Sequence, residues 1–114
     1  MTDFQRDLEV LINEGMFAGK RGKIRFIFKY PDRMVGDIRD LGTNERAYNA
    51  MRRNKIEDIK EIDSHWDSFG NLNGIGATSI KEIKNKYMQY YYDKLNEEER
   101  KEFWRETIKA TMEM

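Results

Sequence analysis

The chain has 114 residues, is 37% charged and 39% hydrophobic, and carries 21 basic and 21 acidic side chains. This length accommodates one small domain with extensions, and because the net charge is zero, a nucleic-acid partner would depend on a local basic patch. The absence of cysteine excludes disulfides and zinc–thiolate sites, and the lack of an apolar run of about 18 residues predicts a cytoplasmic protein with no membrane partner.

An N-terminal extension over residues 1–36 is predicted to hold one helix and one short β segment. The apolar face of the helix consists of Phe4, Leu8, Leu11 and Ile12. Gly15 lies where this helix would end. Apolar and mostly charged side chains alternate over Ile24–Tyr30, which is typical of a strand. The strand needs a partner, either Met16–Ala18 folded back as a hairpin or a second copy of the chain in a homodimer.

The same part of the chain is basic. Its cations, with no acidic residue between them, are Lys20, Arg21, Lys23, Arg25 and Lys29. Such a run is most often the solvated face of a strand, and the alternative interpretation is a patch that binds nucleic acid. The sequence leaves both interpretations open.

The main domain is predicted over residues 37–93, after a boundary at Pro31 and Gly36. A helix begins with Thr43 or Asn44 as its N-cap. Its buried face consists of Ala47, Ala50 and Met51, and its other face carries Arg46, Asn49 and Arg53 at positions i, i+3 and i+7. Most such stripes are ordinary surface. After it, the spacing of Ile56, Ile59 and Ile62 predicts a short buried helix.

A Gly-x-Gly turn that opens into a helix is predicted at Leu72–Lys84. Gly74 and Gly76 allow positive φ and a close approach of the backbone. The free amides near Thr78 and Ser79 would lie at the positive end of the helix dipole, which suits a phosphate. A turn that needs glycine only for packing would give the same pattern.

Residues 94–114 are predicted to form a C-terminal amphipathic helix from about Glu97 to Met112. Asn96 and Glu99 have the spacing of a capping box at its start. We expect this helix to pack on the tyrosine-rich end of the preceding helix, or on a second subunit.

Catalysis is not expected. No paired carboxylates, nucleophile–base set or metal cluster stands out, and the single histidine, His65, has no evident partner. We therefore expect no catalytic residue, no metal and no cofactor.

Two stretches, Asp40–Met51 and Gly74–Ile83, resemble the C-terminal domain of the bacterial RNA polymerase α subunit. The first has an arginine followed three residues later by an asparagine, and the second is similar to the family's L-G-K-K-S-L-x-E-I hairpin and helix. The resemblance covers residues 38 to about 91. It implies a mainly α bundle of short helices with a helix-hairpin-helix motif, which docks in the minor groove of A/T-rich DNA near promoters and contacts transcription factors.

The resemblance also implies roles for single residues. Arg46 matches the arginine that enters the minor groove, Asn49 a DNA-contacting asparagine, and Gly76 and Ser79 the residues that meet phosphate. The family's two hairpin lysines are replaced by Ala77 and Thr78, so we expect weak DNA binding, or binding supplemented by Arg52, Arg53 and the basic segment. The expected DNA-binding residues are Arg46, Asn49, Arg53, Gly74, Gly76, Thr78 and Ser79.

Two functions follow from these observations. The first is a small transcription-associated DNA-binding protein. The second is a protein-interaction module that keeps the fold without strong DNA binding and binds RNA polymerase, a regulator or a copy of itself. The Arg46–Asn49 pair and the hairpin favour DNA binding, whereas the zero net charge and the missing lysines favour the interaction module.

Overall fold

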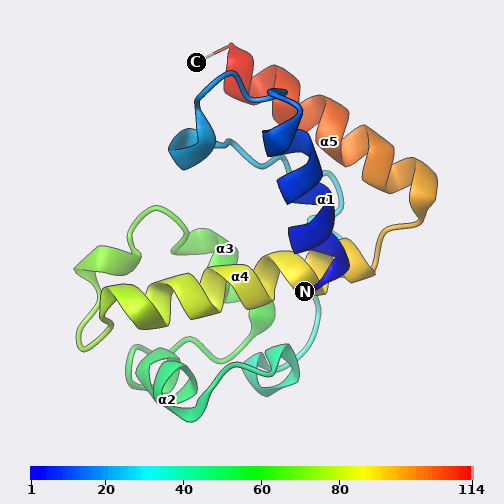
Figure 1. Ribbon diagram of the computed structural model, residues 1–114. Helices are drawn as coiled ribbons and strands as arrows, with labels where there is room; N and C mark the ends of the chain where they lie inside the picture. The colour runs from blue at the N-terminus through cyan, green and yellow to red at the C-terminus, as the bar shows by residue number, and fades with distance from the viewer. Residues whose placement is uncertain (114) are drawn as a thin grey trace. The chain divides into compact units, whose positions relative to one another are not determined.

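The structure, a computed structural model, describes residues 1–113, except for the side chain of Arg21. The fold is mainly α, as predicted, with five α-helices and four short 3-10 turns among the described residues (Figure 1). The chain divides into two units, which we call the terminal unit (Met1–Pro31 with Tyr92–Met114) and the central unit (Asp32–Tyr91). The sequence-based boundaries after residues 36 and 93 stay predictions.

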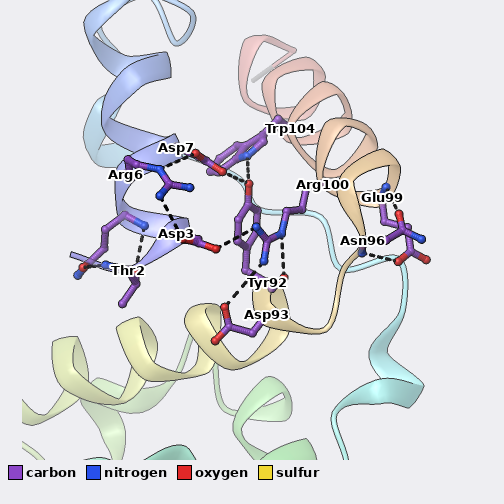
Figure 2. A network of polar contacts seen from close by, with 11 residues as sticks. Thr2, Asp3, Arg6, Asp7, Tyr92, Asp93, Asn96, Glu99, Arg100 and Trp104 are labelled. Carbon is purple, nitrogen blue, oxygen red and sulfur yellow. Dashed lines mark hydrogen bonds and ion pairs between the residues drawn. The ribbon is translucent and has the colours of Figure 1, made fainter.

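Two helices with well-defined N-caps frame the terminal unit. Helix α1 spans Asp3–Asn13, and α5 spans Glu97–Met112, the bounds predicted from the sequence. At the start of α5, the Asn96 side chain accepts the Glu99 N–H and the Glu99 carboxylate accepts the Asn96 N–H, so the predicted capping box is confirmed (Figure 2). These bonds satisfy amides that an uncapped helix would leave without partners.

The short β segment predicted over Ile24–Tyr30 does not form, and residues 1–113 contain no β-strand. Backbone N–H groups of this segment donate instead to α5: Arg25 to Thr111 Oγ1 (2.9 Å) and Ile27 to Thr107 Oγ1 (3.3 Å). Two residues of extended chain span about 6.6 Å and four helical residues about 6 Å, so the N–H groups of Arg25 and Ile27 match threonines that lie four residues apart on α5. Buried threonine hydroxyls therefore accept two N–H groups of this segment in place of the predicted hairpin strand, and pairing with a second copy of the chain stays a prediction.

An aromatic cluster forms the core of the terminal unit. Phe4 stacks on Trp104 with ring centroids 5.6 Å apart. The buried Tyr92 hydroxyl accepts the Trp104 Nε1–H (2.8 Å) and donates to Asp7 Oδ2 (2.6 Å), as Figure 2 shows. Burial and the hydrogen bond to Asp7 raise the pKa of Tyr92, which keeps the phenol neutral. Because Tyr92 lies near the end of α4, the predicted packing of the C-terminal helix on this end is confirmed.

The central unit places short helices around an aliphatic core. Its elements are the 3-10 turns Pro31–Arg33, Ile38–Leu41 and Phe69–Asn71 and the helices α2 (Glu45–Arg53), α3 (Ile59–Ser64) and α4 (Ala77–Asp93), whose last two residues belong to the terminal unit (Figure 1). The fully buried side chains include Ile38, Ala47, Met51, Ile56, Ile59, Ile62 and Ile83. The three isoleucines predicted to be buried are thus all in the core. An isolated bridge between Asp37 and Asp58 ties the start of α3 to the chain before α2.

Candidate nucleic-acid interface

Helix α2 displays the polar stripe that the sequence predicted. The Asn44 side chain caps the helix by accepting the Ala47 N–H at 2.9 Å. Ala47, Ala50 and Met51 are buried, so the opposite face must point outward. The exposed residues of that face include Arg46, Asn49 and Arg53.

The middle of this stripe is free of internal partners. Within residues 1–113, the side chains of Arg46 and Asn49 make no hydrogen bond or ion pair. Residues 45–55 include four basic residues and one acidic residue, and the segment 68–80 has no acidic residue. The α2 surface is therefore locally basic in a chain whose net charge is zero.

The end of α2 is fastened to the Gly74 turn. Arg53 donates from Nη2 to the Gly74 carbonyl at 3.0 Å. The Asn54 side chain donates to the Asn73 carbonyl (2.8 Å) and accepts the Asn73 N–H (3.1 Å). The structure thus joins the arginine stripe, through Arg53, to a turn about twenty residues further along the chain.

The two glycines of the turn serve different purposes. Gly74 has φ +72°, so the backbone favours glycine there, and a Cβ would lie 3.0 Å from Arg53 Nη2, which would have to move. Gly76 has no positive φ, and a Cβ there would meet nothing within 4 Å. The expectation of positive φ is therefore confirmed for Gly74 and wrong for Gly76, which the described fold does not require to be glycine.

Helix α4 begins directly after Gly76. The Ile80 N–H donates to the Gly76 carbonyl at 3.0 Å. The N–H groups of Ala77, Thr78 and Ser79, which come before Ile80, therefore have no acceptor within the helix. Ala77 and Thr78 are exposed, whereas Ser79 is only 6% exposed. Ala77 and Thr78 are thus the accessible residues in the first turn of α4. The Ser79 hydroxyl has less access to a phosphate than the resemblance implies.

A second cluster on α2 was missed by the sequence reasoning. The Tyr48 hydroxyl accepts hydrogen bonds from Arg39 Nη2 (2.7 Å) and Arg52 Nη1 (3.2 Å), and the Arg39 guanidinium lies 4.6 Å from the Tyr48 ring centroid. A tyrosine and an arginine four residues apart on a helix are a local signal for part of this cluster. Arg39 comes from the preceding 3-10 turn, and no helical spacing reveals its position.

The basic segment before Pro31 offers fewer free charges than its composition suggests. Lys29 forms an ion pair with Glu102 of α5, and this hydrogen bond, with the negative charge of Glu102, raises the pKa of Lys29. Lys20 also has an interaction partner in the described part of the chain. The Arg21 side chain lies outside the described residues, so its predicted role cannot be placed. The interpretation as a nucleic-acid patch gains no support here.

Comparisons with protein-family models, curated proteins and solved structures find no match to this chain. Among the described residues, no group of three or more His, Cys, Asp or Glu side chains is placed to hold a metal ion. In the same part of the chain, none of the helices has both the length and the apolar character needed to cross a membrane.

Proposed function

We propose that this chain is a small transcription-associated DNA-binding protein that presents α2 and the start of α4 to the minor groove of A/T-rich DNA. One observation carries the proposal. Arg46, which is exposed and has no acidic partner within residues 1–113, shares a stripe with Arg53, and Arg53 is bonded to the Gly74 turn that leads into α4. The central unit therefore carries both a guanidinium for the minor groove and backbone amides for the DNA phosphates.

Each group on this surface has a matching target on DNA. A narrow A/T-rich groove has a strongly negative potential, which attracts an inserted arginine such as Arg46. Asn49 reaches the hydrogen-bond acceptors on the groove floor. The amides of Ala77 and Thr78 hold a phosphate and set the register without reading sequence. Gly76 has open space where its Cβ would be, so a DNA backbone can approach closely there.

The expected affinity is low, and its dependence on salt is weaker than it would be with lysines at the hairpin. Ala77 and Thr78 provide amides but no cations at the phosphate site, where the family that these residues resemble has two lysines. Each phosphate neutralised by a cation contributes about 0.9 to the slope of log affinity against log salt. The protein therefore depends on the arginines of α2 for most of its electrostatic attraction.

The test is a titration of an A/T-rich duplex at low and moderate salt. Arg46→Ala should weaken binding by about tenfold or more, because it removes the groove contact. The matched control is Lys60→Ala, which removes one positive charge from an exposed side chain of α3 and should change affinity by less than about twofold. Equal losses for the two variants, or no binding of the native chain at low salt, would contradict the proposal.

The second function, a protein-interaction module, is favoured by a feature of the terminal unit. Val10 is 48% exposed and lines an open hollow of about 460 Å³, whose other lining residues are the apolar or aromatic Leu11, Tyr92 and Trp104 and the charged Arg6, Asp7, Glu97, Arg100 and Lys101. Exposed apolar surface of this kind is common at protein interfaces. If the native chain fails to bind DNA, sedimentation of the native chain and of Val10→Asp would test self-association through this hollow. A concentration-dependent dimer that the substitution dissociates would support the interaction module.

A further inference from the structure

Two positive charges converge on one neutral oxygen in the central unit. Nitrogens of Arg39 and Arg52 lie 2.7 Å and 3.2 Å from the Tyr48 hydroxyl oxygen. Neither guanidinium has an ion pair within the part of the chain that the structure describes. Like charges held this close repel each other, and an anion bound between them would convert this repulsion into attraction.

The chemistry of the cluster selects an anion that only accepts hydrogen bonds. Both guanidinium groups are donors, and because the Tyr48 oxygen accepts from both of them, its own O–H is left to donate outward. A hollow of about 360 Å³ adjoins the cluster and is lined by Arg39, Thr43, Glu45 and Tyr48. The Thr43 hydroxyl also lacks a hydrogen-bond partner among the described residues. A phosphate, whose oxygens are all acceptors, satisfies these donors.

The cluster lies on a different side of α2 from the Gly74 turn. At about 100° per residue, Tyr48 is turned about 140° around the helix axis from Arg53, with Asn49 and Arg52 between them. A helix is about 10–12 Å wide and the minor groove about 6 Å wide, so a helix at the mouth of the groove reaches the phosphates of both strands.

We propose that Arg39, Tyr48 and Arg52 form a second phosphate-binding site, which holds the DNA strand opposite to the one held by the start of α4. This inference rests on the proposed DNA binding and adds to it. Asn49 then lies between the two backbone contacts, one on each strand, and Arg46, turned about 160° from Tyr48, enters the groove beside the contact at Arg53. The protein fixes its position across the groove by phosphates on both sides, although the hairpin has no lysines.

The charge of Glu45 should affect the affinity of the second site for phosphate, which it would not do if the cluster had only a structural role. Its carboxylate lines the hollow and has no ion pair among residues 1–113. A phosphate bound next to it is repelled, so Glu45 lowers the affinity. Glu45→Gln should therefore strengthen duplex binding by about two- to fivefold, whereas the arginine substitutions weaken it.

The experiment measures affinity for an A/T-rich duplex over a series of salt concentrations. The double variant Arg39→Gln/Arg52→Gln should bind about three- to tenfold more weakly, with its log–log salt slope lower by about 0.9 for the lost phosphate. Tyr48→Phe removes the oxygen that holds both guanidiniums and should cause a smaller loss. Lys60→Gln is the matched control, and circular dichroism checks that each variant is folded.

The outcomes separate this inference from the proposed function. If the native chain binds and Arg46→Ala abolishes binding, but the double variant and Glu45→Gln keep native affinity and salt slope, the second site is wrong and the groove contact stands. If the native chain shows no binding at low salt, both are wrong. Weaker duplex binding by the arginine variants, tighter binding by Glu45→Gln and unchanged binding by Lys60→Gln would support the second site.

Discussion

The terminal unit pairs several of its basic side chains with carboxylates, which three arginines of the central unit lack among the described residues. Ion pairs of the terminal unit join Arg6 to Asp3 and Asp7, Arg100 to Asp3 and Asp93, Lys29 to Glu102, and Lys101 to Glu98. In the central unit, Arg39, Arg46 and Arg52 have no acidic partner among the described residues. A chain with zero net charge can therefore still hold a basic surface, because local pairing decides which charges remain available to a partner.

The two units also differ in what their side chains stabilise. In the terminal unit, rings and polar groups are buried together, as in the contacts among Asp7, Tyr92 and Trp104 (Figure 2). On α2 of the central unit, two alanines and a methionine are buried and long polar residues are exposed. Substitutions in the aromatic cluster should thus change the free energy of unfolding, whereas those on the α2 surface should change binding.

The largest effect on stability is expected for Trp104→Ala. The substitution removes a buried ring that stacks on Phe4 and leaves the Tyr92 hydroxyl without its Trp104 donor. We expect the free energy of unfolding to fall by about 3–5 kcal/mol. Urea denaturation followed by circular dichroism measures this, with Arg46→Ala as the surface comparison, which should change stability by less than about 0.5 kcal/mol. Similar losses for both variants would remove the distinction between the two units.

A smaller loss is expected when the contact between α5 and the Ile24–Tyr30 segment is weakened. Thr107→Val keeps the shape of the side chain but leaves the Ile27 N–H without its acceptor. The expected cost is about 1–3 kcal/mol in the free energy of unfolding. Thr107→Ser keeps the hydroxyl and should recover most of the hydrogen-bond contribution. If Thr107→Val and Thr107→Ser have the same free energy of unfolding, the threonine hydroxyl does not hold this segment.

The smallest effects on stability are expected for the two glycines of the hairpin, and these two positions should differ clearly from each other. Gly74→Ala forces a side chain into positive φ beside the Arg53 guanidinium, and should cost about 1–2 kcal/mol. Gly76→Ala adds a methyl group in open space and should leave stability within about 0.5 kcal/mol. It should nevertheless weaken duplex binding several-fold, because the methyl group occupies the space that a phosphate needs. Unchanged binding for Gly76→Ala would argue against contact at this turn.

Local signals in the sequence predicted those parts of the fold that depend on nearby residues. The bounds of α5 follow from the Asn96–Glu99 capping box and from apolar spacing, and both operate within a few residues. The exposed positions of Arg46 and Asn49 follow from the buried alanines of the same helix.

Contacts between distant segments explain what the sequence reasoning missed. Ile24–Tyr30 has the alternation of a strand, but its N–H groups meet threonines about eighty residues away, and alternation does not reveal the type of partner. Arg39 reaches Tyr48 from outside the helix, so α2 periodicity gives no sign of that cluster. Whether a Gly-x-Gly turn needs positive φ at its second glycine depends on the backbone of the folded loop.

The most direct test of the account follows the backbone amides of the isotope-labelled full chain by NMR as an A/T-rich duplex is added. The account predicts shift changes at residues 39–53 and 74–79 of the central unit, with the amides of α1 and α5 largely unaffected. Changes confined to the terminal unit, or none at low salt, would contradict the claim that the unpaired arginines of α2 form the DNA-binding surface.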